Sequence, residues 1–429
     1  MIKELHTDVL IIGAGASGAS LSRILTKNSV PHLVLVDEET GTQLNKYHAF
    51  QDVTGYKVGS IQTVRGLGGG TALWGGGLIE FRDSDFNHEL SYGSELIFSG
   101  IKKNYEKAWQ FFEESRNKTQ RTIFAEDCLV LKDAINLSTF IETKNTIAGK
   151  IQSWTLEEKS IRSVIVSIKG EATKIKAEKF VIACGTLGTL RLLWKFSNIF
   201  DERHLNASRT GIYTHPKCNI KFDSKQKNKS LKSKSSQYNH IYNHRILADS
   251  NGSNHALRQE TRLSNRIEIA VEKFSNLPIF TSLIGLKKFV LYLYNKQDFI
   301  LSAVLPKTYK LYIDTISPNF SYHYNQNSDK IILEMIPNNI NVTELNKTIK
   351  SFSKANSVIG AQDITLAHSH YIGGMRVEDG NHAYYTASAR SLLFDNLWIN
   401  SPVLLNAKGY ANPVLSLVAL SYLVAEDLL

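Results

Sequence analysis

The first forty residues change from a strand pattern to a helix pattern and back. Residues 8–12 read DVLII, a short apolar run typical of a buried parallel strand. A glycine-rich stretch, GAGASG at 13–18, follows it, and a second apolar run at 33–36 ends in Asp37. Between them, apolar side chains recur at helical spacing, at Ala19, Leu21, Ile24 and Leu25. This order of strand, glycine turn, helix, strand and acid predicts a βαβ unit that binds a dinucleotide.

The same alternation returns later in the chain. Residues 180–184 read FVIAC, a strand pattern, and a glycine turn leads from it into an apolar helix. Near the C-terminus, a strand pattern at 397–400 precedes an irregular Gly/Asn/Pro segment. A helix follows that segment, with apolar positions at Leu415, Val418, Leu420 and Leu423. We also expect a strand at 331–336 and a helix at 342–358. Strands that alternate with helices in this way indicate an α/β fold.

Each part of the N-terminal unit has a role in binding a nucleotide. Gly13 permits the tight turn, Gly15 lets the backbone approach a pyrophosphate, and Gly18 lets the helix pack closely on the strand. The helix begins near Ala16 and Ser17, and its first turn offers free N–H groups and a positive dipole end to phosphates.

Asp37 follows the second strand, 19 residues after Gly18. A carboxylate there accepts hydrogen bonds from both ribose hydroxyls, and it argues against a 2′-phosphate and therefore against NADP. The unit alone does not distinguish FAD from NAD. A glycine turn without a ligand is the competing interpretation, and the flanking strands and the acid argue against it.

A second glycine cluster lies at residues 65–77, which read RGLGGGTALWGGG. A flexible linker is the alternative interpretation. The interleaved Leu67, Thr71, Leu73 and Trp74 argue against it, because we expect them to be packed anchors. Glycines between such anchors suit a backbone that passes very close to a flat ligand.

With these segments in view, the sequence resembles the glucose-methanol-choline (GMC) family of FAD-dependent oxidoreductases. GAGASG with Asp37 is similar to the family's FAD fingerprint, LGGGTALWGG to its second glycine motif and VIACGTLGTLRLL to its third FAD-domain element. HYIGG and GYANP are similar to its paired active-site segments, and the GYANP form is closest to the sugar and polyol branch. The matches occur in the family's order and reach both ends of the chain.

The resemblance implies an α/β fold, in which a Rossmann-like FAD-binding domain carries an inserted, smaller α+β substrate domain with an antiparallel sheet. The FAD-binding domain would be discontinuous and comprise residues 1–90, 130–210 and 355–429. The substrate-binding domain would comprise residues 91–129 and 211–354.

The resemblance also implies the site residues. His370 and Asn412 fall at the active-site positions. Leu73 stands where some relatives have a histidine bound covalently to the flavin, so a non-covalent FAD is implied. Thr214 departs from a family segment that ends in Asp-His-Pro, so we give His215 no catalytic role. The implied cofactor-binding residues are Gly13, Gly15, Ala16, Ser17, Gly18, Asp37, Glu38, Arg65, Gly69, Gly70, Thr71, Leu73, Trp74, Gly75, Ala183, Gly185, Ser401, Asn412 and Pro413.

His370 is a plausible base for oxidising an alcohol, because imidazole titrates near neutral pH. The Asn412 amide can orient the same hydroxyl, although it competes with a role as a plain helix cap. We therefore expect an enzyme that oxidises a sugar or polyol hydroxyl to a carbonyl with FAD. A flavin isomerase or reductase, and a membrane-surface or lipid-linked-sugar binding protein, stay open as alternatives.

The amino-acid composition limits which binding partners and which cellular compartment fit this chain. The chain has 429 residues, a formal net charge of +10 and three widely spaced cysteines, which exclude a disulfide framework and predict a reducing, cytoplasmic setting. No metal-ligand spacing, signal peptide or apolar run of about 18 residues is visible. The segment 221–234 holds six lysines and one aspartate. We interpret it as a solvated loop or a patch for a phosphorylated or carrier-linked sugar, since no nucleic-acid motif accompanies it.

The segment 277–312 mixes apolar and aromatic residues with lysines. We expect it to be substrate-domain core, with a membrane surface as the alternative. The substrate itself and the external electron acceptor are not identified by the sequence.

Overall fold

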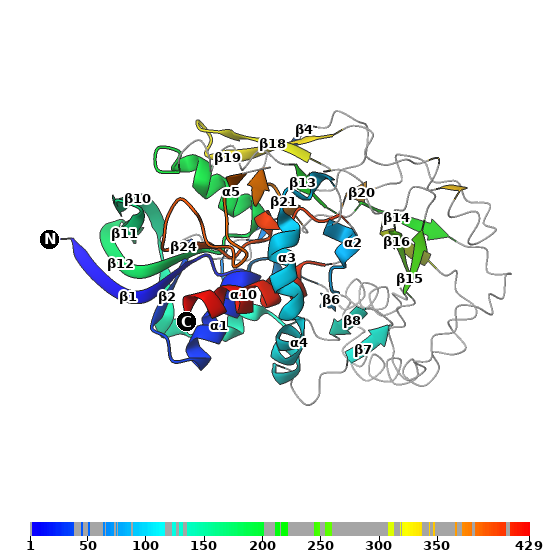
Figure 1. The fold of residues 1–429 in the computed structure, drawn as a ribbon, viewed down its shortest axis with the longest axis horizontal. Coiled ribbons are helices and arrows are strands. Elements are labelled where there is room, and N and C mark those ends of the chain that lie inside the picture. The colour runs from blue at the N-terminus through cyan, green and yellow to red at the C-terminus, as the bar shows by residue number, and fades with distance from the viewer. Residues whose placement is uncertain are drawn as a thin grey trace, which may run out of the picture.

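The computed structural model describes part of the chain (Figure 1). The described residues are 2–37, 44–45, 50–51, 63–64, 66–72, 74, 76–86, 89–115, 122–125, 128–131, 135–200, 211–214, 216–221, 244–248, 254–259, 308–312, 318, 320–336, 343, 346–347, 365–366, 371–379, 382–408 and 412–429.

A sheet of seven described strands organises the part of the fold that carries the nucleotide motif. Its strands are β1 (Lys3–Ile12), β2 (His32–Val36), β9 (Thr146–Ala148), β10 (Lys150–Glu157), β11 (Ser160–Ile168), β12 (Glu171–Ile182) and β24 (Leu397–Ile399). They run in the order β10-β11-β12-β1-β2-β9, and β24 also pairs with β12. β9, β2, β1, β12 and β24 form consecutive parallel pairs, whereas β10 and β11 add an antiparallel extension.

The parallel strands end level with one another. Ile12 of β1 pairs with Ile182 of β12, and Ile182 in turn pairs with Ile399 of β24. Because parallel strands share one carboxyl edge, the residues that follow them gather along that edge. This edge is where open α/β sheets bind their ligands.

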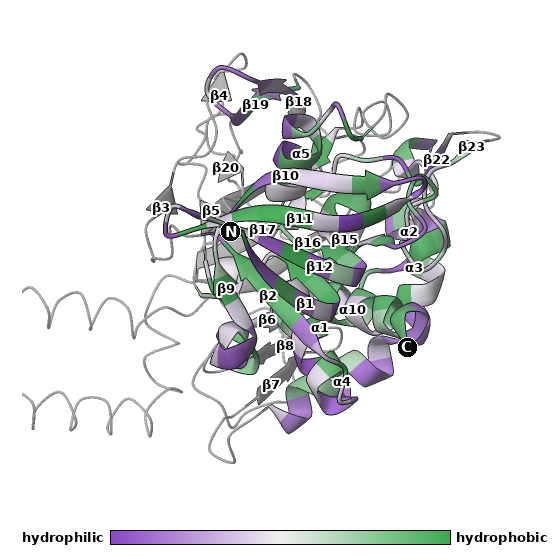
Figure 2. Ribbon diagram, turned by 90° about the vertical axis from the view of Figure 1, so that its left-hand side faces the viewer, coloured by the Kyte–Doolittle hydropathy of each residue, from purple (hydrophilic) through white to green (hydrophobic). Residues whose placement is uncertain are grey.

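Two helices that lie far apart in the sequence pack together against this sheet. They are α1 (Ala16–Lys27) and α10 (Val414–Leu428), and α10 also contacts α3 (Ser94–Lys103) and α4 (Tyr105–Glu114). α10 is apolar around most of its circumference and is largely buried, as a helix between other elements must be. Figure 2 shows the apolar residues of the sheet and α10 lying together in this core. A further helix, α5 (Gly185–Lys195), follows β12 directly.

Two further sheets accompany this one, and the first of them contributes residues to the same hydrophobic core. One has the order β21 (Ile372–Gly373), β13 (Ile212–Tyr213), β18 (Phe320–Asn325), β19 (Lys330–Met335), β4 (Phe50–Gln51), and only the β19–β4 pair in it is parallel. The other is antiparallel, in the order β15 (His244–Ala248), β16 (Asn254–Gln259), β17 (Thr308–Tyr312), β14 (Pro216–Lys221), β20 (Thr365–Leu366). A parallel-rich sheet together with a separate antiparallel sheet confirms the predicted α/β fold class.

Short elements connect these parts. They are β3 (Leu44–Asn45), β5 (Thr63–Val64), β6 (Gly77–Leu78), β7 (Thr122–Ala125), β8 (Cys128–Leu131), β22 (Glu378–Asp379), β23 (His382–Ala383) and the short helix α2 (Asp83–Phe86). Single 3₁₀ turns include Gly69–Ala72 and Pro402–Leu404.

Most local predictions hold, and one does not. The strands predicted at 8–12, 33–36, 180–184, 331–336 and 397–400 appear with ends within two residues of the predicted ones, except that β1 and β12 begin five and nine residues earlier. Leu67, expected to be a packed anchor, is 42% exposed, because it lies in the turn before the 3₁₀ segment and not on its inner side. Most of the helix predicted at 342–358, of the lysine segment 221–234 and of the segment 277–312 lies outside the described residues.

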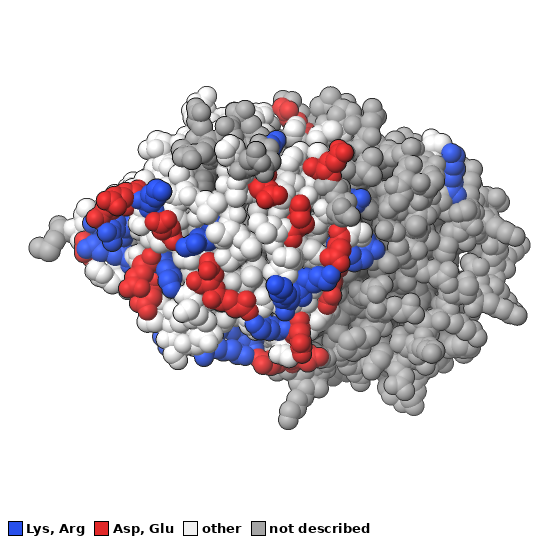
Figure 3. Space-filling view, in the orientation of Figure 1, with Lys and Arg blue, Asp and Glu red and all other residues white. Residues whose placement is uncertain are grey.

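Charge on the described surface is mixed. On the face shown in Figure 3, basic and acidic side chains are interspersed. The ion pairs among the described residues include Lys102–Asp83 at 2.6 Å. Within the described part of the chain, none of the helices has the length and apolar character needed to cross a lipid bilayer.

Candidate functional site

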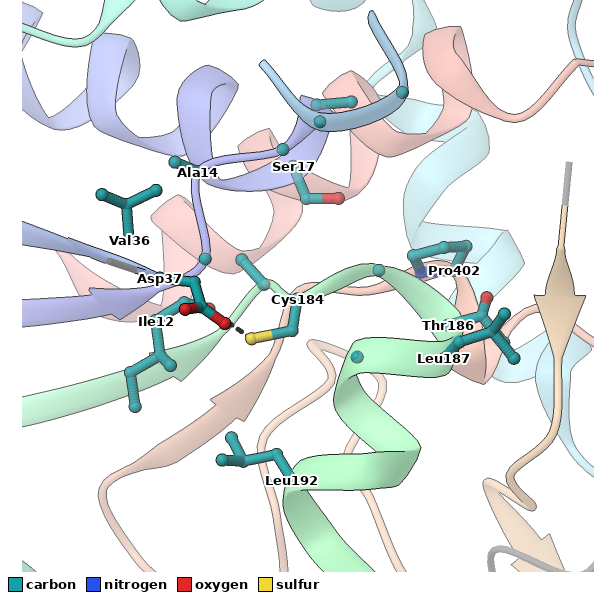
Figure 4. Close-up of a pocket in the computed structure, with 18 of the residues that line it drawn as sticks. Ile12, Ala14, Ser17, Val36, Asp37, Cys184, Thr186, Leu187, Leu192 and Pro402 are labelled. Atoms are coloured by element: carbon teal, nitrogen blue, oxygen red, sulfur yellow. Dashed lines mark hydrogen bonds between the residues drawn. The ribbon is translucent and has the colours of Figure 1, made fainter. Parts of the chain in front are cut away.

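A cavity of about 450 Å³ lies at the carboxyl edge of the parallel strands. Four of its lining residues come directly after strands: Gly13 after β1, Asp37 after β2, Gly149 after β9 and Ala183 after β12. Figure 4 shows Asp37 at one end of the lining and Thr186 at the other. The volume is within the range of about 300–1,000 Å³ that small-molecule sites occupy.

Three glycines leave room inside this cavity. A Cβ atom built on Gly15, Gly70 or Gly185 would have no protein atom within 4 Å. All three line the cavity, so their missing side chains widen it where a ligand would approach the backbone. Gly13 has a different role: its φ is +110°, and a Cβ there would lie 2.5 Å from the Ala183 carbonyl oxygen.

Three helices begin at the cavity wall. The first residues of α1 and α5 line it, and so do Pro413 and Val414 at the start of α10. Each of these helices lacks an acidic residue in its first turn and a side chain that caps it. The positive ends of their dipoles therefore favour a negatively charged group in the cavity.

Charged side chains in the lining add to the electrostatic effect of the helix ends. Among the described lining residues, Asp37 is the one acid, and the bases are Lys150, Arg191 and Lys195. A carboxylate suits ribose hydroxyls, and the bases and helix ends suit phosphates. The lining therefore matches both parts of a nucleotide.

Cys184 is part of the lining but has the properties of a structural thiol. Its Sγ donates a hydrogen bond to the Ile12 carbonyl at 3.1 Å. Burial raises the pKa of the thiol to about 12, so it stays protonated at neutral pH. It is a free, half-buried residue of the cavity wall and is unsuited to act as a nucleophile.

The second glycine segment forms another part of the wall. Gly69, Gly70, Thr71 and Trp74 line the cavity. Gly68 N–H donates to the Ala14 carbonyl at 2.8 Å, which ties this segment to the first glycine turn. Thr71 Oγ1 donates to the Gly68 carbonyl at 2.6 Å, and the Trp74 indole donates to the Ile135 carbonyl at 2.9 Å.

Hydrogen bonds from buried side chains hold the segment 371–375. Thr186 Oγ1, at the start of α5, donates to the carbonyl of Tyr371 at 2.6 Å, and both residues line the cavity. Asn406 is fully buried, donates to the Met375 carbonyl at 2.6 Å and accepts from Gly374 N–H at 3.2 Å. His370, the predicted base, precedes Tyr371 in the chain and lies outside the described residues.

The structure brings many of the predicted cofactor residues together. Those that line the cavity are Gly13, Gly15, Ala16, Ser17, Asp37, Gly69, Gly70, Thr71, Trp74, Ala183, Gly185 and Pro413. Those that lie outside the described residues are Glu38, Arg65, Leu73 and Gly75.

Three described residues from the prediction do not line the cavity. Gly18 packs α1 on the turn, where an added Cβ would lie 1.9 Å from the Gly13 carbonyl oxygen. Ser401 is buried and accepts a hydrogen bond from Thr189 Oγ1 at 3.0 Å. Asn412 is half-buried, and its side-chain amide reaches the Gly77 carbonyl at 3.5 Å, just before Pro413 in the lining.

Some residues of the cavity wall were not predicted from the sequence. Arg191 and Lys195 lie on α5, where we considered only the apolar face, and two basic residues four apart on that helix were an available signal. Lys150 and Phe196 follow β9 and α5 without a motif, so the sequence carried no signal for them.

An adenine dinucleotide such as FAD fits this set of residues. The glycine positions give a cradle that side chains would otherwise fill, Asp37 suits the ribose, and the start of α1 suits the pyrophosphate.

Comparison with solved structures shows the same fold in two oxidases. Formate oxidase matches with a TM-score of 0.57 and 11% identity, over 100% of this chain and 99% of that chain. A structure of the Aspergillus oryzae RIB40 formate oxidase, from a study of FAD modification, matches equally well. Pyridoxine 4-oxidase from Mesorbium loti matches with a TM-score of 0.57 and 13% identity, over 98% of this chain and 99% of that chain.

No protein-family model and no curated protein matches the sequence. The structural likeness nevertheless covers nearly the whole chain, so this protein has the fold of these oxidases. The resemblance to the GMC family that the sequence motifs indicate is thereby confirmed at the level of the fold.

Proposed function

We propose that this protein is an FAD-dependent oxidoreductase that oxidises a hydroxyl group of a small molecule to a carbonyl. The cavity at the carboxyl edge of the sheet carries the proposal, with three open glycine positions and the starts of three helices. The fold shared with formate oxidase and pyridoxine 4-oxidase supports it.

We assign the cofactor contacts to residues of the lining. Asp37 would accept from the ribose, the first turn of α1 would bind the pyrophosphate, and the segment 69–74 would pass beside the flavin. Ser401, Glu38, Arg65, Leu73 and Gly75 stay proposed contacts. We propose that FAD binds non-covalently, because leucine at position 73 has no group that could bond to it.

The oxidation removes two hydrogens from the alcohol, one from the hydroxyl oxygen and one from the carbon, and divides them between the protein and the cofactor. His370 would take the hydroxyl proton, because a neutral imidazole is a base near pH 7. The Asn412 amide would orient the hydroxyl and stabilise developing negative charge on its oxygen. FAD, when bound, supplies the acceptor for the hydride from carbon.

We propose a sugar or polyol as the substrate, on the strength of the GYANP form at 409–413. Formate oxidase and pyridoxine 4-oxidase share the fold, and their names denote substrates other than sugars. A substrate panel for this protein therefore has to include non-sugar alcohols. The three cysteines per chain support a cytoplasmic location.

His370→Ala tests the proposed base. The variant should bind as much FAD as the wild-type protein, and denaturation should release that FAD from both. Its rate of anaerobic flavin reduction by the substrate should fall by about 100-fold or more, the usual contribution of a general base. His382→Ala, at an exposed histidine of β23, is the matched control and should reduce at the normal rate.

Normal reduction in His370→Ala would contradict the assignment of the base. Reduction by NADH but by no alcohol would favour a reductase. A wild-type protein that purifies without FAD and does not take it up would favour a binding protein.

A further inference from the structure

The Asn406 side chain bonds to the segment 371–375, which lies more than 30 residues earlier in the chain. Asn406 is fully buried and follows the 3₁₀ turn Pro402–Leu404. Its Oδ1 accepts from Gly374 N–H at 3.2 Å, and its Nδ2 donates to the Met375 carbonyl at 2.6 Å. An amide bonded at both groups has one favoured orientation, because turning it over would exchange its donor and its acceptor.

The start of α3 also bonds to Asn406. The Ser91 carbonyl accepts from Asn406 Nδ2 at 3.3 Å. Ser94 Oγ accepts from Asn406 Nδ2 and from Asn406 N–H, each at 3.0 Å, and donates to the Leu404 carbonyl at 2.7 Å. Ser91 and Ser94 are buried, so these bonds lie inside the protein. Asn406 therefore joins three parts of the chain that are distant in sequence.

A glycine at position 373 lets the backbone approach this amide. Gly373 has a φ of +74°, in the region that favours glycine. A Cβ atom built on it would lie 2.8 Å from Asn406 Oδ1 and 3.0 Å from a ring carbon of Tyr213. A side chain at this position would push the segment away from Asn406, so the glycine and the amide fit each other.

The segment that Asn406 holds reaches the cavity at Tyr371. Tyr371 lines the cavity, and its carbonyl accepts from Thr186 Oγ1 at 2.6 Å. Thr186 and Asn406 thus fix the two ends of the segment 371–375. One peptide bond joins Tyr371 to His370, the proposed base, and adjacent Cα atoms lie only about 3.8 Å apart. The position of Tyr371 therefore limits where the imidazole of His370 can lie.

We propose that Asn406 is a positioning residue for the catalytic base. By bonding to Gly374 and Met375, it fixes the backbone that continues into His370 and so sets the distance from the base to the substrate hydroxyl. A displacement of about 1 Å can slow an enzymatic reaction by about 100-fold. Asn406 thus controls the rate although it does not line the cavity. This inference rests on the proposed function, because it takes His370 as the base.

Asn406→Ala tests the inference, because it removes the amide. With the alcohol that reduces the wild-type flavin, the limiting rate of anaerobic reduction should fall by about 10-fold to 100-fold. The dissociation constant of FAD, measured by titrating apoprotein, should stay within about threefold of the wild-type value. Asn104→Ala is the matched control: Asn104 is 2% exposed, donates to the Gly100 carbonyl at 3.2 Å and does not line the cavity. Its reduction rate should be normal.

A double variant separates positioning of the base from general damage. His370→Ala has no imidazole to position, so adding Asn406→Ala to it should slow the reduction further by no more than about twofold. If Asn406 acted by another route, the double variant would lose the product of the two single losses. Such a multiplied loss would overturn the inference, and so would a normal rate in Asn406→Ala.

Hydrogen–deuterium exchange of the FAD-free proteins gives a readout that needs neither cofactor nor alcohol. In Asn406→Ala, the amides of the segment 371–375 should exchange about tenfold faster than in the wild-type protein, because Gly374 N–H loses its acceptor and the segment loses its anchor. Asn104→Ala should leave this exchange unchanged. Wild-type exchange in Asn406→Ala would overturn the inference whatever the activity of the protein.

Ser94→Ala decides the question if Asn406→Ala does not fold. It removes one hydroxyl, which bonds to Asn406 and to Leu404. The limiting rate should fall by about threefold or more, and exchange in the segment 371–375 should rise. Wild-type values for both would overturn the inference.

Failure of this inference is distinct from failure of the proposed function. A wild-type protein that takes up no FAD, or whose flavin no alcohol reduces, would contradict the proposed function and this inference with it. A wild-type protein that an alcohol reduces, with an Asn406→Ala variant that is reduced equally fast, would contradict only the role of Asn406.

Discussion

At the scale of single residues, buried polar side chains hold the elements that lead to the cavity. His32, at the start of β2, is one of them and is 5% exposed. Its Nδ1 lies 2.9 Å from the Val30 carbonyl, so Nδ1 carries the proton and Nε2 accepts from Ser22 Oγ at 2.9 Å. Asp37 directly follows β2, so this neutral histidine supports the strand that places the acid that we propose binds the ribose.

His32 makes stability depend on pH. Burial lowers the pKa of His32, and its hydrogen bond to Val30 opposes the shift. The unfolded chain therefore binds a proton more readily than the folded protein, and the contribution of His32 is lost as pH falls below about 6.5 toward the folded pKa. The free energy of unfolding of the wild-type protein should fall more steeply than that of His32→Gln between about pH 7 and pH 5.

Denaturant titrations at each pH would measure this difference. His6→Gln is the control, because the His6 side chain is 68% exposed and lies outside the core. Parallel pH dependences for His32→Gln and the wild-type protein would show that His32 is not kept neutral by the fold.

At the scale of elements, the turn between β1 and α1 assigns different tasks to its glycines. Gly13 and Gly18 face protein atoms, at 2.5 Å and 1.9 Å from a built Cβ, and Gly15 faces the cavity. Gly15 has a φ of −76°, which any residue can adopt. Packing therefore requires two of these glycines, and we propose that the ligand requires the third.

Alanine substitutions should separate these tasks. Gly15→Ala should fold with unchanged stability, and its FAD dissociation constant should rise by about tenfold or more, since the methyl group enters the ligand's space. Gly18→Ala should lose about 1–3 kcal/mol of unfolding free energy through overpacking. Denaturant unfolding of the apoproteins and FAD titration would measure the two effects. A Gly15→Ala protein with normal FAD affinity would show that no ligand lies against this turn.

These elements also show which parts of the fold and of the site could be predicted from the sequence. GAGASG, the strands beside it and Asp37 are local in sequence, so their pattern predicted a turn that the structure contains. The pair Arg191–Asp329 joins residues 138 apart, and no periodicity reports such a contact. Likewise, Asn400 donates to the Ser17 carbonyl at 3.2 Å and ties β24 to α1, although 383 residues separate them. Leu67 was misjudged because a glycine-rich turn does not reveal which side faces inward.

At the scale of the whole molecule, the cavity is assembled from the two ends and the middle of the chain. Its lining includes residues 12–17, 35–37, 149–151, 183–188 and 413–414 within a longer set. The large sheet likewise draws β1 and β24 from opposite ends of the sequence. The division into a discontinuous FAD-binding domain and an inserted substrate-binding domain stays a prediction. The lysine segment 221–234, which holds half of the net charge, stays a proposed substrate or surface feature.

The most direct test of the account is an anaerobic titration of the FAD-loaded wild-type protein with sugars, polyols and simple alcohols. The visible absorption of oxidised flavin reports the result. We expect at least one alcohol to abolish that absorption without oxygen or a nicotinamide cofactor. A protein that takes up no FAD, or a bound flavin that NADH reduces and every alcohol leaves oxidised, would contradict the account.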